Sequence, residues 1–261
     1  MITEPASPTS PATLDQLRPA LADSAARLAN LVGPLTPEGV RGPSYCSEWS
    51  VADVLSHLGS GAVIFRRRLD DDADLDTQAV WDAWNAKSPD EQASDCLLAD
   101  GALLKVVAAL GAGSDRRFSM GPFDLDEATF LSLRLNEHVI HTWDIEVSLD
   151  PAATIPEAAA GLIVDSLGIM AGLVGKPTGT EKTFTVRTSA PTRQFELAIR
   201  ADGVSLSPVA VADGPLPDSA NALNLSADAL IRLVYGRLAV TDGAADGSPE
   251  LGELRQVFPG F

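Results

Sequence analysis

Apolar residues recur at helical spacing in four long segments of the first 150 residues, and this pattern constrains the fold more than any other feature. The segments run over residues 14–32, 51–68, 90–110 and 124–149. Apolar side chains three and four positions apart share one face of a helix, and that face must be buried against another element. Four such segments predict an antiparallel four-helix bundle.

Local signals mark the ends of these segments. Ser50 is a good N-cap, and Asp53 three residues later completes a pattern close to a capping box. Glycines after residue 110 end the third segment, and Pro151 follows the fourth. Residues 1–11 are rich in Pro, Ser and Thr, so we expect them to be disordered.

The second half of the chain has a different pattern. Residues 156–174 read as one apolar helix, and residues 226–235 as another that begins at the N-cap Ser226. Between them lie short strand-like segments, at residues 183–188, 195–200, 204–207 and 223–225. The expected fold class is therefore α+β, with a helical bundle over residues 12–152 and a small α/β domain over residues 153–261.

The net charge of the chain argues against two classes of binding partner. The chain carries 36 acidic and 19 basic residues, a formal charge of −17. Nucleic-acid binding and docking on anionic membranes both need a basic surface, so we expect neither partner. The acidic surface is explained by solubility.

The chain carries no sign of export or of membrane insertion. Its first residues lack a basic start followed by an apolar run, and no stretch approaches the length of a membrane span. The two cysteines, Cys46 and Cys96, form no disulfide framework. We therefore expect a cytoplasmic protein with reduced thiols.

Polar residues stand where the bundle should be apolar. Glu137, His141 and Asp144 share one face of the fourth helical segment, and His57 lies at the edge of the apolar stripe of the second. Burying such groups is unfavourable unless each finds a strong partner. One possibility is a metal ion, because two imidazoles and a carboxylate form a common Zn²⁺ ligand set that also suits Fe²⁺ or Ni²⁺. The other is a hydrogen-bonded network without metal, and spacing alone leaves both open.

Two neighbouring residues have separate expected roles. Asp144 lies one turn after His141, where its carboxylate can accept the imidazole N–H that does not face the metal. His138 projects about 100° away from Glu137 around the helix, which suits a neighbouring helix or the surface better than the ligand set.

Four residues near these segments are assigned mainly to packing. Cys46 precedes the second helix, and we favour a packed residue over a fourth ligand or a redox-sensitive thiol. Cys96 lies in a helical pattern and is expected in the core. Trp49 and Trp143 are also expected to pack in the core, with the lining of a substrate pocket as the alternative.

Four segments resemble a known family. Residues 44–58, S-Y-C-S-E-W-S-V-A-D-V-L-S-H-L, resemble the entry to the second helix of DinB/YfiT-like proteins. The resemblance is strongest to their actinobacterial branch, the mycothiol-dependent maleylpyruvate isomerase family, in which a Trp-[Ser/Thr]-Val start leads to a metal-binding histidine. Residues 136–144, N-E-H-V-I-H-T-W-D, resemble the Glu-x-x-x-His-x-x-Asp motif of that family. Residues 229–238 and 257–261 resemble the end of its C-terminal domain.

This resemblance implies a site and an activity. It implies a DinB-like metal-binding four-helix bundle with a small α/β C-terminal domain. His57, Glu137 and His141 become the metal ligands, Asp144 supports them, and Arg237 becomes a candidate for contacting the thiol cofactor or the substrate. The implied cosubstrate is mycothiol, a low-molecular-weight thiol, and the implied activity is that of an isomerase or S-transferase.

A coordinated thiol is held as thiolate, the nucleophilic form, which can attack an electrophilic carbon of a small substrate. The substrate itself and the choice between monomer and homodimer stay open. Two other functions also stay open: a metal-binding module without turnover, and a hydrolase that uses a metal-bound water. Patterns for a Ser-His-Asp triad, a phosphate-binding glycine loop or a nucleotide fingerprint are missing from the sequence.

Overall fold

The chain forms two compact units, a helical N-terminal unit and a C-terminal unit built on a sheet. The computed structural model describes residues 12–72, 74–111, 115–120, 123–216, 221–238 and 249–260. The units are Ala12–Ile155 and Pro156–Phe261, so the division falls three residues after the expected one. The α+β fold class is confirmed. The prediction of disorder for residues 1–11 lies outside the described residues.

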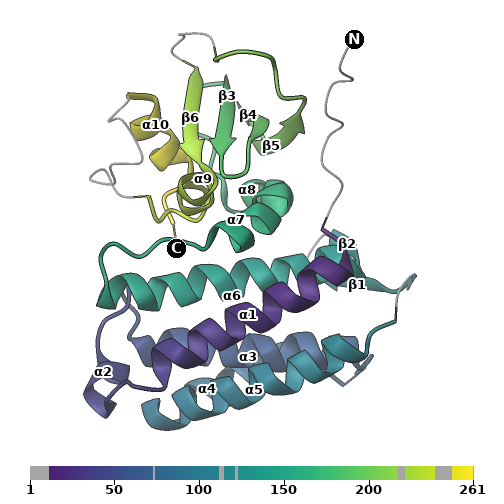
Figure 1. Cartoon of the computed structure of the whole chain (residues 1–261), viewed down its shortest axis with the longest axis vertical. Coiled ribbons are helices and arrows are strands. Elements are labelled where there is room, and N and C mark those ends of the chain that lie inside the picture. The colour runs from purple at the N-terminus through teal and green to yellow at the C-terminus, as the bar shows by residue number, and fades with distance from the viewer. Residues whose placement is uncertain are drawn as a thin grey trace. The chain divides into compact units, whose positions relative to one another are not determined.

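The N-terminal unit contains the four long helices that periodicity predicts. They are α1 (Leu14–Val32), α3 (Val51–Leu69), α5 (Pro89–Ala109) and α6 (Glu127–Leu149), which lie side by side in Figure 1. Helix α3 packs on α5 and α6, and α1 packs on the same two helices. The four helices therefore close around one core.

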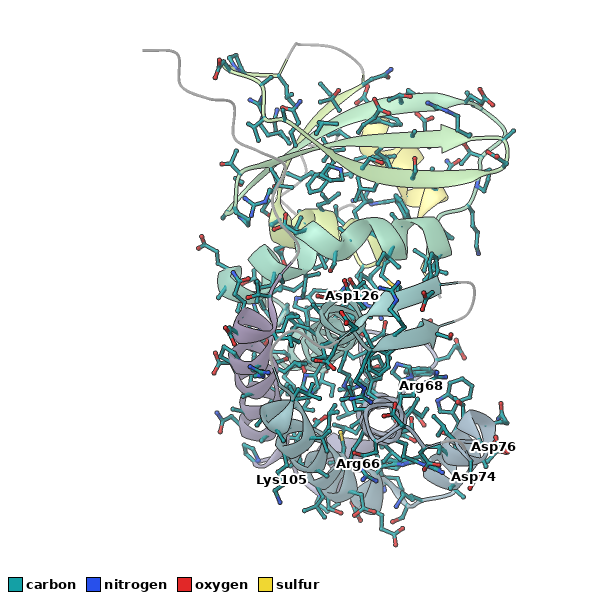
Figure 2. The ribbon with its side chains drawn as sticks, turned by 90° about the vertical axis from the view of Figure 1, so that its right-hand side faces the viewer. Arg66, Arg68, Asp74, Asp76, Lys105 and Asp126 are labelled. Carbon is teal, nitrogen blue, oxygen red and sulfur yellow. The ribbon has the colours of Figure 1, made fainter. Side chains whose placement is uncertain are left out.

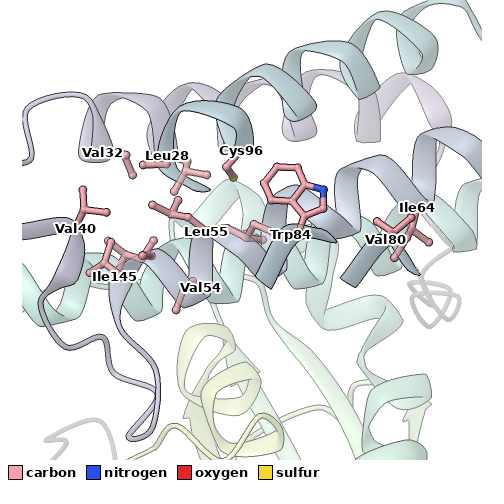
Figure 3. Close-up of a cluster of buried hydrophobic side chains, with 14 residues drawn as sticks. Leu28, Val32, Val40, Val54, Leu55, Ile64, Val80, Trp84, Cys96 and Ile145 are labelled. Atoms are coloured by element: carbon pink, nitrogen blue, oxygen red, sulfur yellow. The ribbon is translucent and has the colours of Figure 1, made fainter. Parts of the chain in front are cut away.

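That core is dense enough to require a glycine. Figure 3 shows part of it, with Leu28 of α1, Leu55 of α3 and Cys96 of α5 among the buried side chains. A Cβ on Gly59 of α3 would lie 2.2 Å from the ring of Trp84 and 3.1 Å from the Cα of Cys96. The missing side chain thus lets helices approach closely. Cys96 is completely buried, which confirms its expected place in the core.

Four short elements of this unit escaped the sequence analysis. They are α2 (Pro37–Arg41), α4 (Thr77–Asn85), β1 (Arg117–Met120) and β2 (Phe123–Asp126), the last two forming an antiparallel hairpin. Because the hairpin includes residues 124–126, α6 begins three residues later than predicted.

Aspartates labelled in Figure 2 mark two of the helix starts. The Asp76 carboxylate accepts a hydrogen bond from the Ala79 N–H at the start of α4, and Asp126 does the same for Thr129 at the start of α6. Both aspartates therefore act as N-caps, a role in which the side-chain oxygen pairs a backbone N–H at the start of a helix.

The C-terminal unit contains a four-stranded sheet in the order β5-β4-β3-β6. The strands are β3 (Lys182–Ser189), β4 (Arg193–Arg200), β5 (Gly203–Val209) and β6 (Ala222–Ser226). Neighbours pair antiparallel except β3 and β6, which run parallel. The four predicted strands are thus present. Helix α9 (Ala227–Val234) follows β6 as expected, and α10 (Pro249–Val257) was not predicted.

The apolar segment expected as one helix over residues 156–174 is interrupted. It forms α7 (Glu157–Ile163), a 3₁₀ turn at Val164–Ser166, and α8 (Leu167–Val174). Helix α8 lies so close to β5 that a Cβ on Gly168 would come within 2.5 Å of the Leu206 carbonyl oxygen.

The same segment corrects an expectation about membrane spans. Residues Glu157–Val174 form an 18-residue window with a mean hydropathy of 1.6. By length and composition alone, such a segment could cross a membrane. The expectation that no stretch approaches the length of a membrane span was therefore wrong. Core helices of globular domains pass the same test. In the structure 28% of this window is buried, including Ile163, Val164 and Leu167, and the 3₁₀ turn at Val164–Ser166 interrupts it.

Candidate metal centre

Three side chains from two helices of the N-terminal unit converge. The Nε2 atom of His57 on α3 lies 3.2 Å from Oε2 of Glu137 on α6. The Nε2 atom of His141, one turn further along α6, lies 3.6 Å from the same oxygen. All three potential ligand atoms lie within 4.8 Å of one another. The structure therefore brings together the three residues that the sequence analysis named as ligands.

The start of α3 fixes where His57 stands. Ser50 and Asp53 form a complete capping box, in which each side chain accepts a hydrogen bond from the backbone N–H of the other residue. The loop before it is fastened to α6, because the Tyr45 N–H donates to the Asp144 carbonyl oxygen at 3.0 Å. His57 thus lies two turns into a helix whose entry is attached to the helix that carries the other two ligands.

The geometry and chemistry of these residues fit a divalent cation. In a tetrahedral zinc site with bonds of 2.0–2.2 Å, neighbouring ligand atoms are about 3.3–3.6 Å apart. The two separations from the Glu137 oxygen, 3.2 and 3.6 Å, are close to that range. The side chains of His57 and Glu137 are 37% and 29% exposed to solvent, so the cluster is open on one side.

Behind His141 lies a fully buried carboxylate. Oδ2 of Asp144 is 2.8 Å from Nδ1 of His141, and its side chain has no exposed surface. Because a carboxylate only accepts hydrogen bonds, Nδ1 carries the proton and the Nε2 lone pair faces Glu137 when the ring is neutral. The thiol of Cys46 donates to the same Asp144 oxygen at 3.2 Å, so this half-buried cysteine supports Asp144.

Electrostatics bind this cluster together in the absence of a cation. Burial lowers the pKa of His141, but hydrogen bonds with Asp144, Cys46 and Glu137 outweigh that effect and raise the pKa to about 10. Burial raises the pKa of Glu137, but the two imidazoles outweigh it and hold the pKa well below its usual range. Burial lowers the pKa of His57, and its hydrogen bond with Glu137 offsets this only in part. A proton on His141 therefore occupies the position that a cation would take.

The ring of Trp49 packs against both imidazoles. Its ring centroid is 5.4 Å from that of His57 and 6.0 Å from that of His141, and it stacks on the latter at 24°. The residue is 36% exposed, so its expected place in the core was wrong. Trp143 is buried and donates from Nε1 to the Ala153 carbonyl oxygen at 2.9 Å, which confirms the core assignment for that residue.

His138 lies outside the ligand set, as its helical angle predicted. It is buried, with Nε2 2.9 Å from Oδ2 of Asp100 on α5 and Nδ1 2.8 Å from the Ser24 hydroxyl on α1. Arg134 donates to the other oxygen of Asp100. The sequence analysis missed both Asp100 and Arg134. Their only signal was a charged residue among apolar neighbours, and no pattern linked the two helices.

Arg237 lies in the C-terminal unit, just after α9. It is 5% exposed and donates from Nη1 to the Tyr235 carbonyl oxygen at 2.8 Å. The intervening Gly236 has φ of 71° and touches the chain end so closely that a Cβ there would lie 2.2 Å from the nitrogen of Gly260. Only glycine fits this position, which explains the Tyr-Gly-Arg sequence.

A comparison with protein families concerns the N-terminal unit. Residues 21–146 match the family described as the mycothiol maleylpyruvate isomerase N-terminal domain. The N-terminal unit belongs to this family. All three candidate ligands lie within the part that matches the mycothiol maleylpyruvate isomerase N-terminal domain.

Solved structures give a second comparison. The chain resembles the crystal structure of the mycothiol-dependent maleylpyruvate isomerase, with a TM-score of 0.62 over 88% of this chain and 92% of that one. A histidine-to-alanine mutant of that enzyme matches equally well. Sequence identity is 10% in both cases, so the likeness shows the fold. No curated protein matches the chain significantly.

Proposed function

We propose that the chain is a metal- and mycothiol-dependent enzyme, either an isomerase similar to maleylpyruvate isomerase or a thiol S-transferase. One observation carries the proposal: the ligand atoms of His57, Glu137 and His141 converge on a partly open position. They do so within a domain of a family that is named for mycothiol and maleylpyruvate isomerase.

The proposed cofactor is a divalent cation held by His57, Glu137 and His141. Zn²⁺ fits this ligand set best, and Ni²⁺ or Fe²⁺ also suit it. When bound, the cation supplies a Lewis acid that holds a thiol sulfur as thiolate at neutral pH.

The chain itself orients the reactants. Asp144 holds the Nδ1 proton of His141 and so fixes the direction of its Nε2 lone pair. Trp49 covers one side of the two imidazoles and offers the exposed part of its ring to a planar substrate. We assign to Arg237 the binding of an anionic group of the thiol or of the substrate, through its guanidinium.

The proposed reaction needs no further reactant. Addition of the thiolate to a cis double bond conjugated with a carbonyl converts it to a single bond, and the electron pair moves into the enolate. Rotation about that bond and loss of the same thiolate give the trans isomer, so no atom is gained or lost. A substrate with a leaving group gives a thiol conjugate instead. We further propose a cytoplasmic location, since low-molecular-weight thiols stay reduced there.

The test is turnover that depends on both metal and thiol. Zinc-loaded protein is incubated with mycothiol and maleylpyruvate, and the change in ultraviolet absorbance is followed. We expect isomerisation that stops when either metal or mycothiol is left out, and a higher KM in Arg237→Lys. Metal-dependent turnover without any thiol would favour the hydrolase, and binding of both without turnover across a panel of electrophiles would favour a binding module.

A further inference from the structure

A second polar cluster lies in the same bundle, fully buried. It consists of Asp100 on α5 with Arg134 and His138 on α6, and all three side chains are at most 5% exposed. Oδ1 of Asp100 accepts from Nη2 of Arg134 at 2.8 Å, and Oδ2 accepts from Nε2 of His138 at 2.9 Å. The Ser24 hydroxyl forms a hydrogen bond of 2.8 Å with Nδ1, the remaining ring nitrogen of His138, which extends the cluster to α1.

Arg134 extends the cluster to a third neighbouring helix. Its Nη2 also donates to the carbonyl oxygen of Leu58 at 3.0 Å, and Leu58 directly follows His57 on α3. A Cβ on Gly61 of α3 would come within 2.8 Å of Nη1 of Arg134. The guanidinium therefore rests on α3 at the one place where a glycine leaves room for it.

The cluster also brackets the ligands on α6. Arg134 stands three residues before Glu137, and His138 stands directly after it and three residues before His141. Directional hydrogen bonds thus tie α6 to α5 and α3 at the level of the candidate metal centre.

Stability alone is a weak reason for such a cluster. Replacing a buried ion pair by apolar residues of similar volume is often neutral or stabilising. Nε of Arg134 has no acceptor among the described residues, which adds to the penalty of burying the guanidinium. Ligand sets, by contrast, need their side chains held to within about 0.5 Å.

We propose that Asp100, Arg134 and His138 are positioning residues, which hold α3 and α6 in the alignment at which His57 meets Glu137 and His141. The inference rests on the proposed metal centre. Without the bond from Arg134 to the Leu58 carbonyl, α3 is free to shift along α6, and the His57 nitrogen leaves the distance at which three ligands share one cation.

A matched pair of glycine variants tests this. Gly61→Ala and Gly101→Ala each place one methyl group on a helix of the bundle and favour helix formation equally. The new methyl of Gly61→Ala displaces the Arg134 guanidinium, whereas a Cβ on Gly101 meets nothing within 4 Å. Zinc affinity of the metal-free proteins is measured by competition with a chromophoric chelator, and the Co²⁺ spectrum reports ligand geometry.

We expect Gly61→Ala to bind zinc about tenfold more weakly, with a changed Co²⁺ spectrum, and Gly101→Ala to match the wild type. Both proteins should keep the helical circular dichroism of the wild type. A Gly61→Ala protein with wild-type zinc affinity and an unchanged Co²⁺ spectrum would overturn the proposal. Equal loss of affinity in both glycine variants would also overturn it.

A second test removes the charges of the cluster. Asp100→Leu/Arg134→Met removes both charges at once and leaves no unpaired buried charge, so it is expected to fold. Leu17→Ala, at a fully buried position near the start of α1, is its control for loss of stability alone. We expect weaker zinc binding in the double variant and wild-type affinity in Leu17→Ala. If the wild type binds no divalent cation, the metal centre fails; if it binds one and the double variant binds it equally well, only the positioning role fails.

Discussion

Helix α6 carries two polar clusters, and they differ in how completely their groups are paired. In the buried cluster of Asp100, Arg134 and His138, both oxygens of Asp100 accept a hydrogen bond, one from Arg134 and one from His138. All three side chains are buried. In the candidate metal centre the imidazoles of His57 and His141 face a single oxygen of Glu137, and one side is open. A closed, paired cluster fits a structural role. An open cluster in which two imidazoles share one acceptor fits a site that is completed by a ligand.

The largest contrast between the clusters should appear in stability. Arg134→Leu leaves the buried Asp100 without its cation and is expected to lower the free energy of unfolding by about 3–5 kcal/mol. Glu137→Gln keeps a side chain of the same shape at the partly open metal centre and removes a charge that both imidazoles face, so its loss should be smaller, about 1–3 kcal/mol. Urea denaturation of the metal-free proteins measures both. Equal losses would erase the distinction between a structural and a functional cluster.

Zinc affinity should depend more on the candidate metal centre than on the buried cluster of Asp100, Arg134 and His138. Binding free energies of about 10–16 kcal/mol are shared among a few zinc ligands, so removal of one should weaken binding at least about 100-fold. We expect this of His141→Ala and a smaller loss, about tenfold, of His138→Ala. Chelator competition gives both dissociation constants. A larger loss in His138→Ala would exchange the roles of the two histidines.

A weaker effect is expected from the carboxylate behind His141. Asp144→Asn keeps the shape of the side chain but removes the charge that accepts the Nδ1 proton. Zinc affinity should fall about 10- to 100-fold, as for other residues that orient metal-binding histidines. The same competition assay measures it, with Cys46→Ser as the control that retains a donor to Asp144. An unchanged dissociation constant in Asp144→Asn would show that Asp144 does not support the ligand.

The last prediction concerns pH, with an expected change in zinc affinity of about tenfold per pH unit. The pKa of His141 is about 10 in the metal-free protein, so the ring is protonated near pH 8 and must lose this proton when Nε2 binds a cation. The lowered pKa values of His57 and Glu137 leave those groups ready to bind without further loss of protons. Zinc affinity should therefore rise about tenfold per pH unit between pH 7 and 9, with about one proton released. Calorimetry in buffers of different ionisation enthalpy counts that proton, and affinity independent of pH would contradict the assignment.

The sequence predicted those parts of the fold that depend on long periodic patterns. The four long helices have apolar stripes that only a helix buries on one face. The short α2, α4 and the β1–β2 hairpin escaped because few residues give no readable period, and tertiary contacts decide their structure. Trp49 was misplaced because an aromatic residue in a loop carries no pattern that reports its exposure.

The site was predictable only in part for the same reason. The spacing of Glu137 and His141 places them on one face of α6, and this follows from helix geometry. Their meeting with His57 depends on how α3 and α6 are aligned, which the family resemblance supplied and local patterns did not. The pairing of Asp100 with Arg134 joins residues 34 positions apart on two helices, and no resemblance pointed to it.

X-ray absorption at the zinc edge of the zinc-loaded protein tests the central claim most directly. The account predicts one zinc per chain, with two imidazole nitrogens and a carboxylate oxygen at about 2.0–2.2 Å. His57→Ala should lose one imidazole from this shell. Absence of bound zinc, a sulfur ligand from Cys46 at about 2.3 Å, or an unchanged imidazole count in His57→Ala would contradict the account.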